Sequence, residues 1–487
     1  MPYATYPHVL MYDRPGGTAI QDLLWGDYLG DVLETDGEWS RVEARGPDGW
    51  IKTDQMQDNR ILEVNFIDVG QGDGCFIVTP DDRYLLIDAG QYANMERFLT
   101  WRFNLRYHEQ TIKPFEYAII SHPDEDHYRG FAPLFTNERF RFETVCHNGI
   151  IERAGDDMLG LKVEHEGQAY LAEVVDTDAE LRQLVDQDSM RGGKRYPNML
   201  YQARQTNRVD AFRMVSTDGT SAFLPGYDPV NGDSIAIQIL APVHETLPGS
   251  DRKVLRDFGR PGVTKNGHSV VLKLTFGKVR ILLGGDLNTK SEAYLLAHYT
   301  GLNPLSEDPA EIVRLVAKGR EFFEADIAKA CHHGSHEFLD VFLRCVNPLA
   351  TIVSSGDGEP HAHPRPDALG ALGKNGRGQR PLIFSTELAR SAREGIDKPE
   401  KLVALINELE DAIRTATEPA VRAQRQQEKA AAYRLLERSI AVYGMINVRT
   451  DGERVIIAQK LEKPGSGGRK YDIHQLELVE GVLQYVP

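Results

Sequence analysis

Short apolar runs recur between residues 62 and 357, and most of them end in Gly, Pro, Asp or His. They include LEVNFIDVG, CFIVTP, YLLIDAG, FEYAIISH, SVVLKLTF, VRILLGGD, DIAKACHH and ATIVSSGD. Runs of this length between turn residues are typical of buried strands, and amphipathic stretches such as TKSEAYLLAHY lie between several of them. Buried strands with intervening helices predict a layered α/β fold, in which polar residues at strand ends build the functional site.

Charged residues gather directly after one of these runs. FEYAII is followed by SHPDEDH, which places two histidines and three carboxylates within residues 122–127. Imidazole and carboxylate are ligands of divalent metal ions, and a tight loop lets them point to two sides. Three further clusters follow other runs: Asp286 closes VRILLGGD, His332 and His333 follow IAKAC, and His363 lies in PHAHPRP. Four such clusters at predicted strand ends indicate a metal pocket.

The composition is that of a folded, acidic protein. The 487 residues are 41% hydrophobic, enough for sizeable cores, and carry a formal net charge of -16. An acidic surface argues against a nonspecific coat for nucleic acid but leaves a local phosphate-binding site open. The four cysteines form no CxxC pair, and we find neither a signal peptide nor an apolar run long enough to span a membrane. We expect a cytoplasmic protein with no membrane partner.

The chain divides into three predicted parts. Residues 1–57 show short alternating strands, and DGEWSRVEA with PDGWI resembles the bacterial SH3-like domain, in which Gly49-Trp50 would close a small barrel. An edge-strand extension of the next domain is the alternative. Residues 62–380 form the predicted α/β domain, with an insertion at about 150–233 in which MRGGKRYPNMLYQARQTNR reads as a basic loop. Residues 381–487 predict a C-terminal extension of long helix and a β-hairpin.

Several motifs taken in order resemble the metallo-β-lactamase fold, and within it the ComEC-like branch related to competence DNA-uptake proteins. The resemblance covers about residues 62–370, and the motifs are IDVGQGD (67–73), LLIDAG (85–90), SHPDEDH (121–127), HSVVLKL (268–274), LLGGD (282–286), HHGS (332–335), and SSGD (354–357) with His363-Pro364. The resemblance implies an αββα sandwich with a dinuclear metal site on its edge.

The ligands of both ions follow from the same resemblance. It implies that one ion is held by His122, Asp124 and Asp286, and the other by Asp126, His127, Asp286 and His332. The sequence departs from the wider superfamily in one respect. Asp124 stands where that superfamily has His, as in the ComEC-like branch, and the further histidine of the first ion has only His147 or His268 as candidates.

The ligand set predicts hydrolytic chemistry. Two divalent ions lower the pKa of a bridging water, so that the resulting hydroxide can attack phosphorus. Three carboxylates among six ligands favour Mn²⁺ or Mg²⁺ more than an all-imidazole pocket would, and Zn²⁺ also fits. We expect Asp126 and His363 to act in catalysis, with His363 binding a substrate oxygen or protonating the leaving group. Asp88, Asp73, His333 and His268 are expected to orient ligands by hydrogen bonds or to contact substrate.

Three functions are compatible with these residues. The first is a metal-dependent phosphodiesterase, foremost a nuclease, whose substrate is nucleic acid or another phosphodiester. The second is a hydrolase of a small phosphoester or an amide. The third is a non-catalytic scaffold that binds a partner protein through the SH3-like or C-terminal region. The intact set of metal ligands argues against the scaffold.

Overall fold

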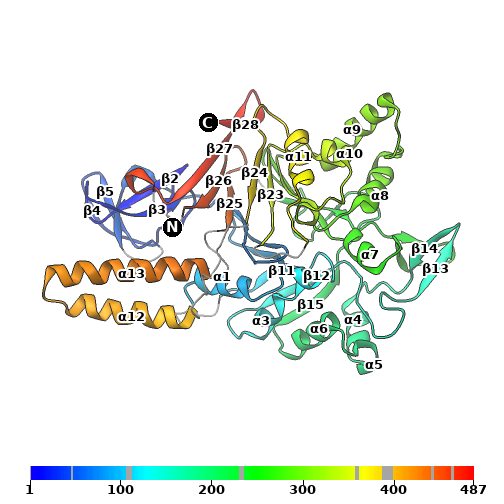
Figure 1. The fold of residues 1–487 in the computed structure, drawn as a ribbon, viewed down its shortest axis with the longest axis horizontal. Helices are drawn as coiled ribbons and strands as arrows, with labels where there is room; N and C mark the ends of the chain where they lie inside the picture. The colour runs from blue at the N-terminus through cyan, green and yellow to red at the C-terminus, as the bar shows by residue number, and fades with distance from the viewer. Residues whose placement is uncertain are drawn as a thin grey trace.

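The structure is a computed structural model that describes residues 2–44, 48–105, 112–229, 235–356, 361–386, 399–439, 444–461 and 465–486. Two large sheets and the helices on their outer faces form most of the molecule (Figure 1). Asp357 of the SSGD motif lies outside the described residues. Among the residues described, no helix combines the length and the apolar character needed to cross a bilayer.

The first sheet has ten strands and combines the apolar runs of the first half of the chain with the C-terminal strands. Its order is β15 (Val209–Met214), β12 (Phe142–His147), β11 (Phe115–Ile119), β10 (Tyr84–Ala89), β9 (Gly74–Val78), β8 (Leu62–Phe66), β25 (Ile446–Thr450), β26 (Val455–Lys460), β27 (Tyr471–Val479) and β28 (Val482–Val486). Strands β10, β11, β12 and β15 run parallel, so their carboxyl ends lie at one edge.

The second sheet has seven strands. Its order is β16 (Ala222–Phe223), β17 (Ala236–Ala241), β20 (Val271–Phe276), β21 (Val279–Leu283), β22 (Ile327–Lys329), β23 (Ala350–Val353) and β24 (Leu382–Ser385). Strands β21 to β24 are parallel to one another, and the loops after β21 and β22 carry the LLGGD and HHGS motifs. Both sheets thus present the carboxyl ends of parallel strands to a common polar region.

Three apolar cores hold four layers together. The middle core lies between the sheets and takes alternate side chains from both, such as Ile77 and Leu274. A second core lies between the ten-stranded sheet and helices α1 (Asn94–Arg102), α3 (Phe131–Thr136), α4 (Asp178–Val185) and α6 (Arg195–Gln205). A third core joins the seven-stranded sheet to α8 (Thr289–Thr300), α9 (Pro309–Phe323) and α10 (Asp340–Val346). The helix–sheet–sheet–helix order confirms the predicted mixed α/β architecture.

The stretch 150–233 contains both appended elements and parts of the sandwich. Strands β13 (Lys162–His165) and β14 (Gln168–Leu171) form a separate sheet with β18 (Glu245–Thr246) and β19 (Lys253–Arg256). In contrast, β15 pairs in parallel with β12, and α6 packs into the second core. The prediction of a loop around MRGGKRYPNMLYQARQTNR was wrong for residues 195–205. Tyr196, Met199, Leu200 and Ala203 share one apolar helix face there, and Pro197 is tolerated because it lies in the first turn.

The N-terminal residues form a small unit of their own. Strands β3 (Ala19–Leu24), β2 (His8–Tyr12), β6 (Gly49–Lys52), β5 (Trp39–Val42) and β4 (Val32–Asp36) make an antiparallel sheet, and β1 (Tyr3–Ala4) pairs with β7 (Met56–Gln57). Val9, Met11 and Leu23 belong to its separate core. Buried Trp25 packs against Ile456 and Ala458 of β26, so the unit is docked on the C-terminal strands.

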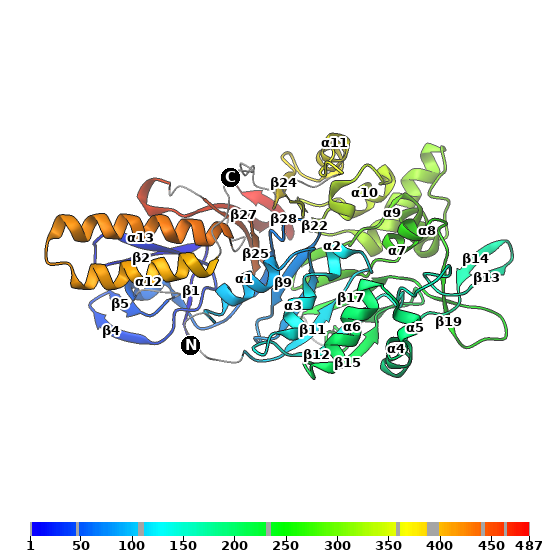
Figure 2. The same cartoon turned by 60° about the horizontal axis from the view of Figure 1, so that its bottom comes forward.

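Two antiparallel helices, α12 (Pro399–Thr415) and α13 (Pro419–Ser439), project from the sandwich at the end that carries the N-terminal unit (Figure 2). Leu402, Ile406, Ala432 and Leu436 pack between them, with Trp101 of α1 against this core. The predicted hairpin around Asp451-Gly452 is confirmed, because β25 and β26 pair antiparallel. These strands continue the ten-stranded sheet through the pairing of β25 with β8.

The remaining helices are α2 (Glu125–Tyr128), α5 (Asp188–Arg191), α7 (Pro261–Gly267) and α11 (Pro366–Asn375). Of these, α2 follows β11 and lies at the polar edge of the sheets. Gly72 shows how closely the backbone packs here, because it has a φ of +93° and a Cβ at its position would lie 1.6 Å from the carbonyl oxygen of Asp126. Glycine therefore lets the DVGQGDG turn approach α2.

Candidate metal centre

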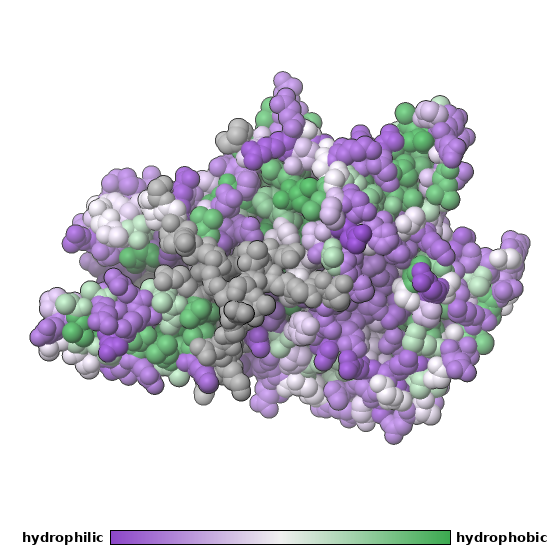
Figure 3. Space-filling view, viewed as in Figure 1, coloured by the Kyte–Doolittle hydropathy of each residue, from purple (hydrophilic) through white to green (hydrophobic). Residues whose placement is uncertain are grey.

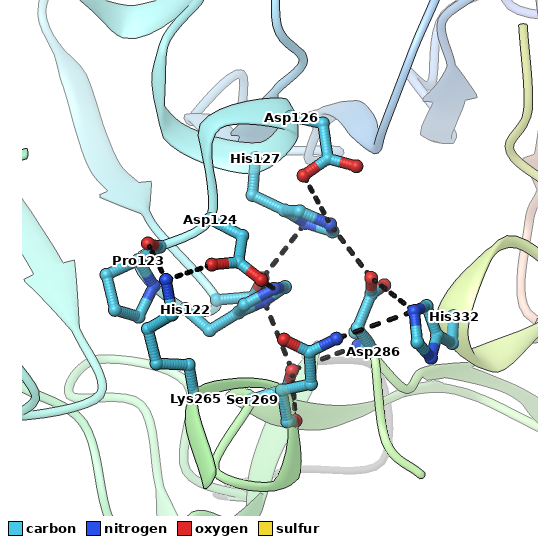
Figure 4. Close-up of polar contacts among 12 residues, drawn as sticks. His122, Pro123, Asp124, Asp126, His127, Lys265, Ser269, Asp286 and His332 are labelled. Atoms are coloured by element: carbon cyan, nitrogen blue, oxygen red, sulfur yellow. Dashed lines mark hydrogen bonds and ion pairs between the residues drawn. The ribbon is translucent and has the colours of Figure 1, made fainter. Parts of the chain in front are cut away.

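Six candidate ligands lie in loops and short helical turns at the carboxyl ends of parallel strands (Figure 4). The loop after β11 carries His122 and Asp124 and leads into α2, which holds Asp126 and His127. Asp286 follows β21, and His332 follows β22. Figure 4 shows Asp286 between His127 and His332, with His122 to the left of Asp286 and below His127. The sheets therefore bring together residues separated by up to 210 positions in the chain.

The ring nitrogens of three histidines converge on carboxylate oxygens. Oδ2 of Asp286 lies 3.2 Å from Nε2 of His127 and 3.1 Å from Nε2 of His333. Oδ2 of Asp126 lies 3.5 Å from the same nitrogen of His333. His122, His127 and Asp286 form one compact group of potential ligands, and Asp126, His127 and His333 form another. Two atoms that share an ion at about 2.1 Å lie roughly 3.0–3.4 Å apart, so these separations suit metal ligands.

Hydrogen bonds at Nδ1 fix the tautomer of two of these rings. Nδ1 of His127 donates to Oδ2 of Asp88 at 2.8 Å, and Nδ1 of His333 donates to the carbonyl of Ser354 at 2.9 Å. In both rings the proton is therefore on Nδ1, and the lone pair of Nε2 faces the centre. Asp88 also accepts from the N–H of Ser121 at 2.8 Å, so it fixes the metal loop and the ring together.

The ring of His122 is oriented by Ser269. The Ser269 hydroxyl donates to the carbonyl of Asn266 at 2.8 Å, so its oxygen accepts from Nδ1 of His122 at 3.2 Å. It also accepts from the N–H of Asp286 at 2.9 Å. One serine thus positions a ligand from each sheet. Its neighbour His268 does not join the cluster, because Nε2 of that ring donates to the carbonyl of Arg256 at 2.7 Å.

The residues present fit a divalent metal. Nε2 of His122, His127 and His333 is buried and has no hydrogen-bond partner among the residues described. A buried ring nitrogen without a hydrogen bond is costly, whereas bound metal ions would satisfy all three nitrogens. Carboxylates orient or face the rings, the pattern typical of histidines that bind metals. The donor set of imidazoles and carboxylates therefore suits divalent cations.

The electrostatics of the cluster favour a bound cation. Burial lowers the pKa of His127, but the carboxylates of Asp286, Asp88 and Asp126 outweigh burial and hold that pKa well above its usual value. Burial also acts to lower the pKa of His333, but the carboxylates of Asp286 and Asp73 outweigh burial and raise it. In turn, these histidines and Lys329 hold the pKa of Asp286 well below its usual value, although burial acts to raise it. The negative charge that attracts a proton to Nε2 would attract a metal ion to the same atom.

Asp124 is placed differently from the other candidate ligands. Its carboxylate forms an ion pair with Nζ of Lys265 (Figure 4). The side-chain amide of Asn266, turned with its nitrogen toward Asp124, donates to Oδ2 at 2.8 Å. Oδ2 of Asp124 lies 3.6 Å from Nε2 of His122. Burial acts to raise the pKa of Asp124, but His122 and Lys265 lower it to about 2. Asp124 therefore borders the cluster and shares its charge with a lysine.

The two adjacent histidines of the HHGS motif diverge. Both have positive φ values, 48° for His332 and 52° for His333, which turn their rings to different sides. The structure brings His333 to 3.1 Å from Asp286 and leaves His332, the ligand implied by the resemblance, at 4.0 Å from the same oxygen. His332 instead faces His363, with 5.6 Å between the ring centroids. His332 and His363 thus line one side of the cluster.

The remaining candidate histidine, His147, ends β12 but is not in the cluster. Its Nδ1 accepts from the N–H of Gly149 at 3.0 Å, and burial lowers its pKa to about 4. Neither His147 nor His268 belongs to a group of potential ligands among the residues described. Neither candidate therefore supplies the further histidine ligand that the resemblance implies for the first ion.

Sequence reasoning missed two lysines of the centre. Lys329 lies at the end of β22, 5% exposed, where Nζ pairs with Asp73, donates to the carbonyl of Gly285 at 2.9 Å and lies 3.4 Å from Oδ1 of Asp286. The second lysine is Lys265, which pairs with Asp124. The sequence carried a signal for Lys329, because this lysine lies inside the apolar run DIAKAC and a buried lysine almost always has a carboxylate partner. No local pattern marked Lys265.

Comparison with known families agrees with this geometry. A model of the Metallo-beta-lactamase superfamily matches residues 70–348, more than half of the chain. The chain therefore belongs to the metallo-beta-lactamase superfamily. The matched segment contains every histidine and carboxylate of the cluster, and it ends before His363. Membership together with the converging ligands supports a metal-dependent hydrolase that binds divalent ions at this centre.

Two individual relatives are similar to parts of the chain. A segment of 117 residues, 24% of this chain, is 32% identical to competence protein ComA of Neisseria gonorrhoeae. The chain covers only 14% of that protein's length. A solved structure of a metal-dependent hydrolase from Parabacteroides distasonis is 11% identical over 74% of this chain and 98% of that one, with a TM-score of 0.27. At this TM-score the likeness carries no weight, whereas the segment shared with a competence protein agrees with the predicted branch.

Proposed function

We propose that the protein is a metal-dependent phosphodiesterase, and foremost a nuclease, with a dinuclear centre. The observation that carries the proposal is the convergence of three buried imidazole nitrogens on Asp286, with Asp126 at the same space. Structural ion pairs do not need three adjacent rings whose Nε2 atoms all point inward. Hydrolysis of phosphodiesters by paired divalent ions is chemistry that such a donor set supports.

The residues divide between two metal positions. Asp126, His127, Asp286 and His333 would hold one ion, and His122 with Asp286 and Asp124 would hold the other. The ions, when bound, would supply a hydroxide nucleophile at neutral pH and the positive charge that stabilises a phosphate transition state. Zn²⁺, Mn²⁺ and Mg²⁺ all suit this mixture of nitrogen and oxygen donors, and the carboxylates favour the harder ions.

The charge balance of the centre is compatible with an anionic substrate. Asp124, Asp126 and Asp286 are its candidate carboxylate ligands, while Asp73 is paired with Lys329. Two divalent ions carry four positive charges, which three carboxylates and one hydroxide would cancel. In such a neutral centre each ion would still polarise a phosphate oxygen that it binds directly.

We assign proton handling to the two histidines beside the cluster. His332 is partly exposed, and burial lowers its pKa although Asp286 acts to raise it, so the ring is neutral at pH 7. A neutral imidazole can bind a substrate hydroxyl or take up a proton. His363 faces it from the next loop and would return a proton to the leaving oxygen. Asp126 contributes by holding its ion where the phosphate binds.

The N-terminal unit and the helical hairpin would bind a partner protein or guide substrate. Support comes from the unit's own five-stranded antiparallel sheet and core, which agree with an SH3-like domain. The helical hairpin exposes the apolar side chains of Leu405, Val421, Tyr433 and Leu435. The lower left of Figure 3 shows apolar surface along this hairpin. We place the protein in the cytoplasm, where divalent metals and nucleic acid are both accessible.

The test is a nuclease assay on single-stranded DNA, plasmid DNA and RNA with Mn²⁺, Mg²⁺ or Zn²⁺. Wild type should cut at least one nucleic acid, and Asp126→Ala should lower kcat by at least about a hundredfold because it removes a ligand. Asp156→Ala, which changes an exposed carboxylate, is the matched control and should retain the rate. Cleavage of a chromogenic diester with no cleavage of nucleic acid would favour a small-molecule enzyme. Cleavage of neither would overturn the proposal.

A further inference from the structure

A cavity of about 300 Å³ lies beside the candidate metal centre, and the proposed chemistry leaves it without a role. Its polar lining comes from the metal loop, from the segment after β12, from the start of α6 and from α7. The residues that matter are Asp124, Glu125, Glu152, Lys194, Arg195 and Lys265. Asp124 is shared with the metal centre, so a molecule that occupies the cavity can also reach the cluster.

Most charges in this lining are already paired. Lys265 pairs with Asp124 and lies 3.1 Å from Glu152, and Nη1 of Arg195 lies 2.7 Å from Glu125. If Asp124 is counted with the metal ions, the lining holds one more cation than carboxylates. The cavity therefore suits a ligand with one negative charge.

Lys194 is the cation that remains. Its Nζ contacts Sδ of Met158 at 3.0 Å, and no carboxylate lies within 4.0 Å of it among the residues described. A thioether offers little compensation for the positive charge of a half-buried ammonium group. A bound anion would therefore stabilise the charge of Lys194. Lys194 is also the residue that precedes α6, so its charge stands at the positive end of an 11-residue helix.

The start of α6 adds backbone donors to the same place. No side chain caps the helix, and its first turn has no acidic residue. The N–H groups of Arg195 and Tyr196 have no acceptors within the helix because they lie in its first turn, and Pro197 at the third helical position has no N–H. Such groups bind phosphate oxygens well. The cavity, the uncompensated lysine and the helix end thus favour the same kind of ligand.

We propose that this cavity binds the phosphate next to the one that is cleaved, so that the substrate is a single strand of linked nucleotides. The inference rests on the proposed function and narrows its substrate class. An isolated diester has no second phosphate and would leave Lys194 unused. A cavity of about 300 Å³ admits one nucleotide of a strand, whereas a duplex would have to separate before entering.

The experiment compares two substrates in two lysine variants. Lys194→Met keeps the length of the side chain and removes the charge, and Lys374→Met removes an exposed charge that pairs with Asp340 outside the cavity. Each is assayed for kcat/KM on a short oligothymidylate and on bis(p-nitrophenyl) phosphate. Lys194→Met should lower kcat/KM about tenfold on the oligonucleotide and leave the simple diester unchanged, while Lys374→Met should change neither.

Two further measurements connect the loss to the neighbouring phosphate. In the first, a neutral methylphosphonate replaces the phosphate on one side or the other of the cleaved linkage. At one of these two positions the replacement should make kcat/KM of wild type and of Lys194→Met equal. In an Asp126→Asn background, which should bind without cutting, Lys194→Met should weaken binding of a fluorescent oligothymidylate about tenfold and reduce its salt dependence by about one ion.

The outcomes separate this inference from the proposed function. Equal effects of Lys194→Met on both substrates, or no effect on either rate or binding, would overturn the inference while leaving a phosphodiesterase intact. Failure of wild type to cut either substrate with any metal would overturn both. The urea unfolding midpoints of both lysine variants are measured as well. If these midpoints match that of wild type, a lower rate does not result from unfolding.

Discussion

At the scale of single residues, the centre depends on which nitrogen of each histidine carries the proton. Asp88 and the Ser354 carbonyl hold Nδ1–H of His127 and His333, and this leaves Nε2 of both rings as a lone pair. The orienting groups therefore favour the tautomer that can bind a metal through Nε2. They also keep the rings from rotating, so binding costs less side-chain entropy.

Replacing Asp88 by Asn tests this orientation. The amide can keep accepting from the N–H of Ser121 only by turning its NH₂ toward Nδ1 of His127, which forces the proton of that ring onto Nε2. We expect metal affinity to fall by about 10- to 100-fold, measured by titration against a fluorescent chelator. Asp81→Asn, at an exposed carboxylate that pairs with Arg83, is the control. Unchanged affinity in Asp88→Asn would show that the hydrogen bond does not set the tautomer.

The sequence predicted the cluster at this scale better than the details within it. His122, Asp126, His127 and Asp286 are brought together because each follows a buried strand, and that pattern is visible in the chain. The choice between adjacent histidines was not visible, since it depends on two positive φ values at one turn. The proximity of Lys265 to Asp124 joins segments about 140 residues apart and leaves no local signal.

At the scale of elements, strands with long apolar runs were predictable and strands defined by distant pairing were not. VDAFRM becomes the edge strand β15 because it pairs with β12, although Asp210 and Arg213 interrupt its apolar letters. The C-terminal hairpin was predicted from Asp451-Gly452, yet its place beside β8 comes from a pairing across almost 400 residues. Local propensity does not encode such partners.

Helix α8 contains a buried acid that makes stability depend on pH. Burial raises the pKa of Glu292 from its usual 4.5 to about 8, and the N–H of Leu339, which donates to Oε2 at 2.6 Å, offsets only part of the rise. The folded state therefore keeps a proton that the unfolded state releases above about pH 4.5. The stability that this proton confers is complete below that pH and is lost as pH rises through about 8.

Glu292→Gln should remove this dependence, because the amide stays neutral and can still accept from Leu339. Between pH 5.5 and pH 8, we expect wild type to lose on the order of 2–3 kcal/mol of unfolding free energy relative to Glu292→Gln. Urea titrations at the two pH values measure the difference. Glu321→Gln, at an exposed position of α9, should follow wild type at both. Parallel pH profiles of Glu292→Gln and wild type would contradict the raised pKa.

At the scale of the whole molecule, one buried arginine joins three parts of the chain. Arg449 of β25 is 1% exposed, and its guanidinium donates to the carbonyl of Trp25 at 2.6 Å and lies 2.9 Å from Asp27 in the N-terminal unit. It also lies 3.7 Å from Glu63 of β8. The N-terminal unit is thus attached to the sandwich by charge as well as by the apolar contacts of Trp25.

Arg449→Met should loosen that attachment. The substitution leaves the buried carboxylates of Asp27 and Glu63 without the arginine charge, which costs about 3–5 kcal/mol. We expect the N-terminal unit to unfold at lower urea, and proteolysis between residues 58 and 61 to become faster. Arg41→Met removes a half-exposed pair and should shift unfolding by less than about 1 kcal/mol. Equal unfolding of Arg449→Met and wild type would show that apolar packing alone holds the unit.

The most direct test of the metal centre is equilibrium dialysis with Mn²⁺ and with Zn²⁺, comparing wild type with His333→Ala and His361→Ala. His333 lies in the cluster and His361 is exposed, so only the first substitution removes a proposed ligand. The account predicts stoichiometric metal in wild type and His361→Ala, and affinity at least about a hundredfold lower in His333→Ala with an unchanged circular dichroism spectrum. Metal bound to folded His333→Ala as tightly as to wild type would contradict it.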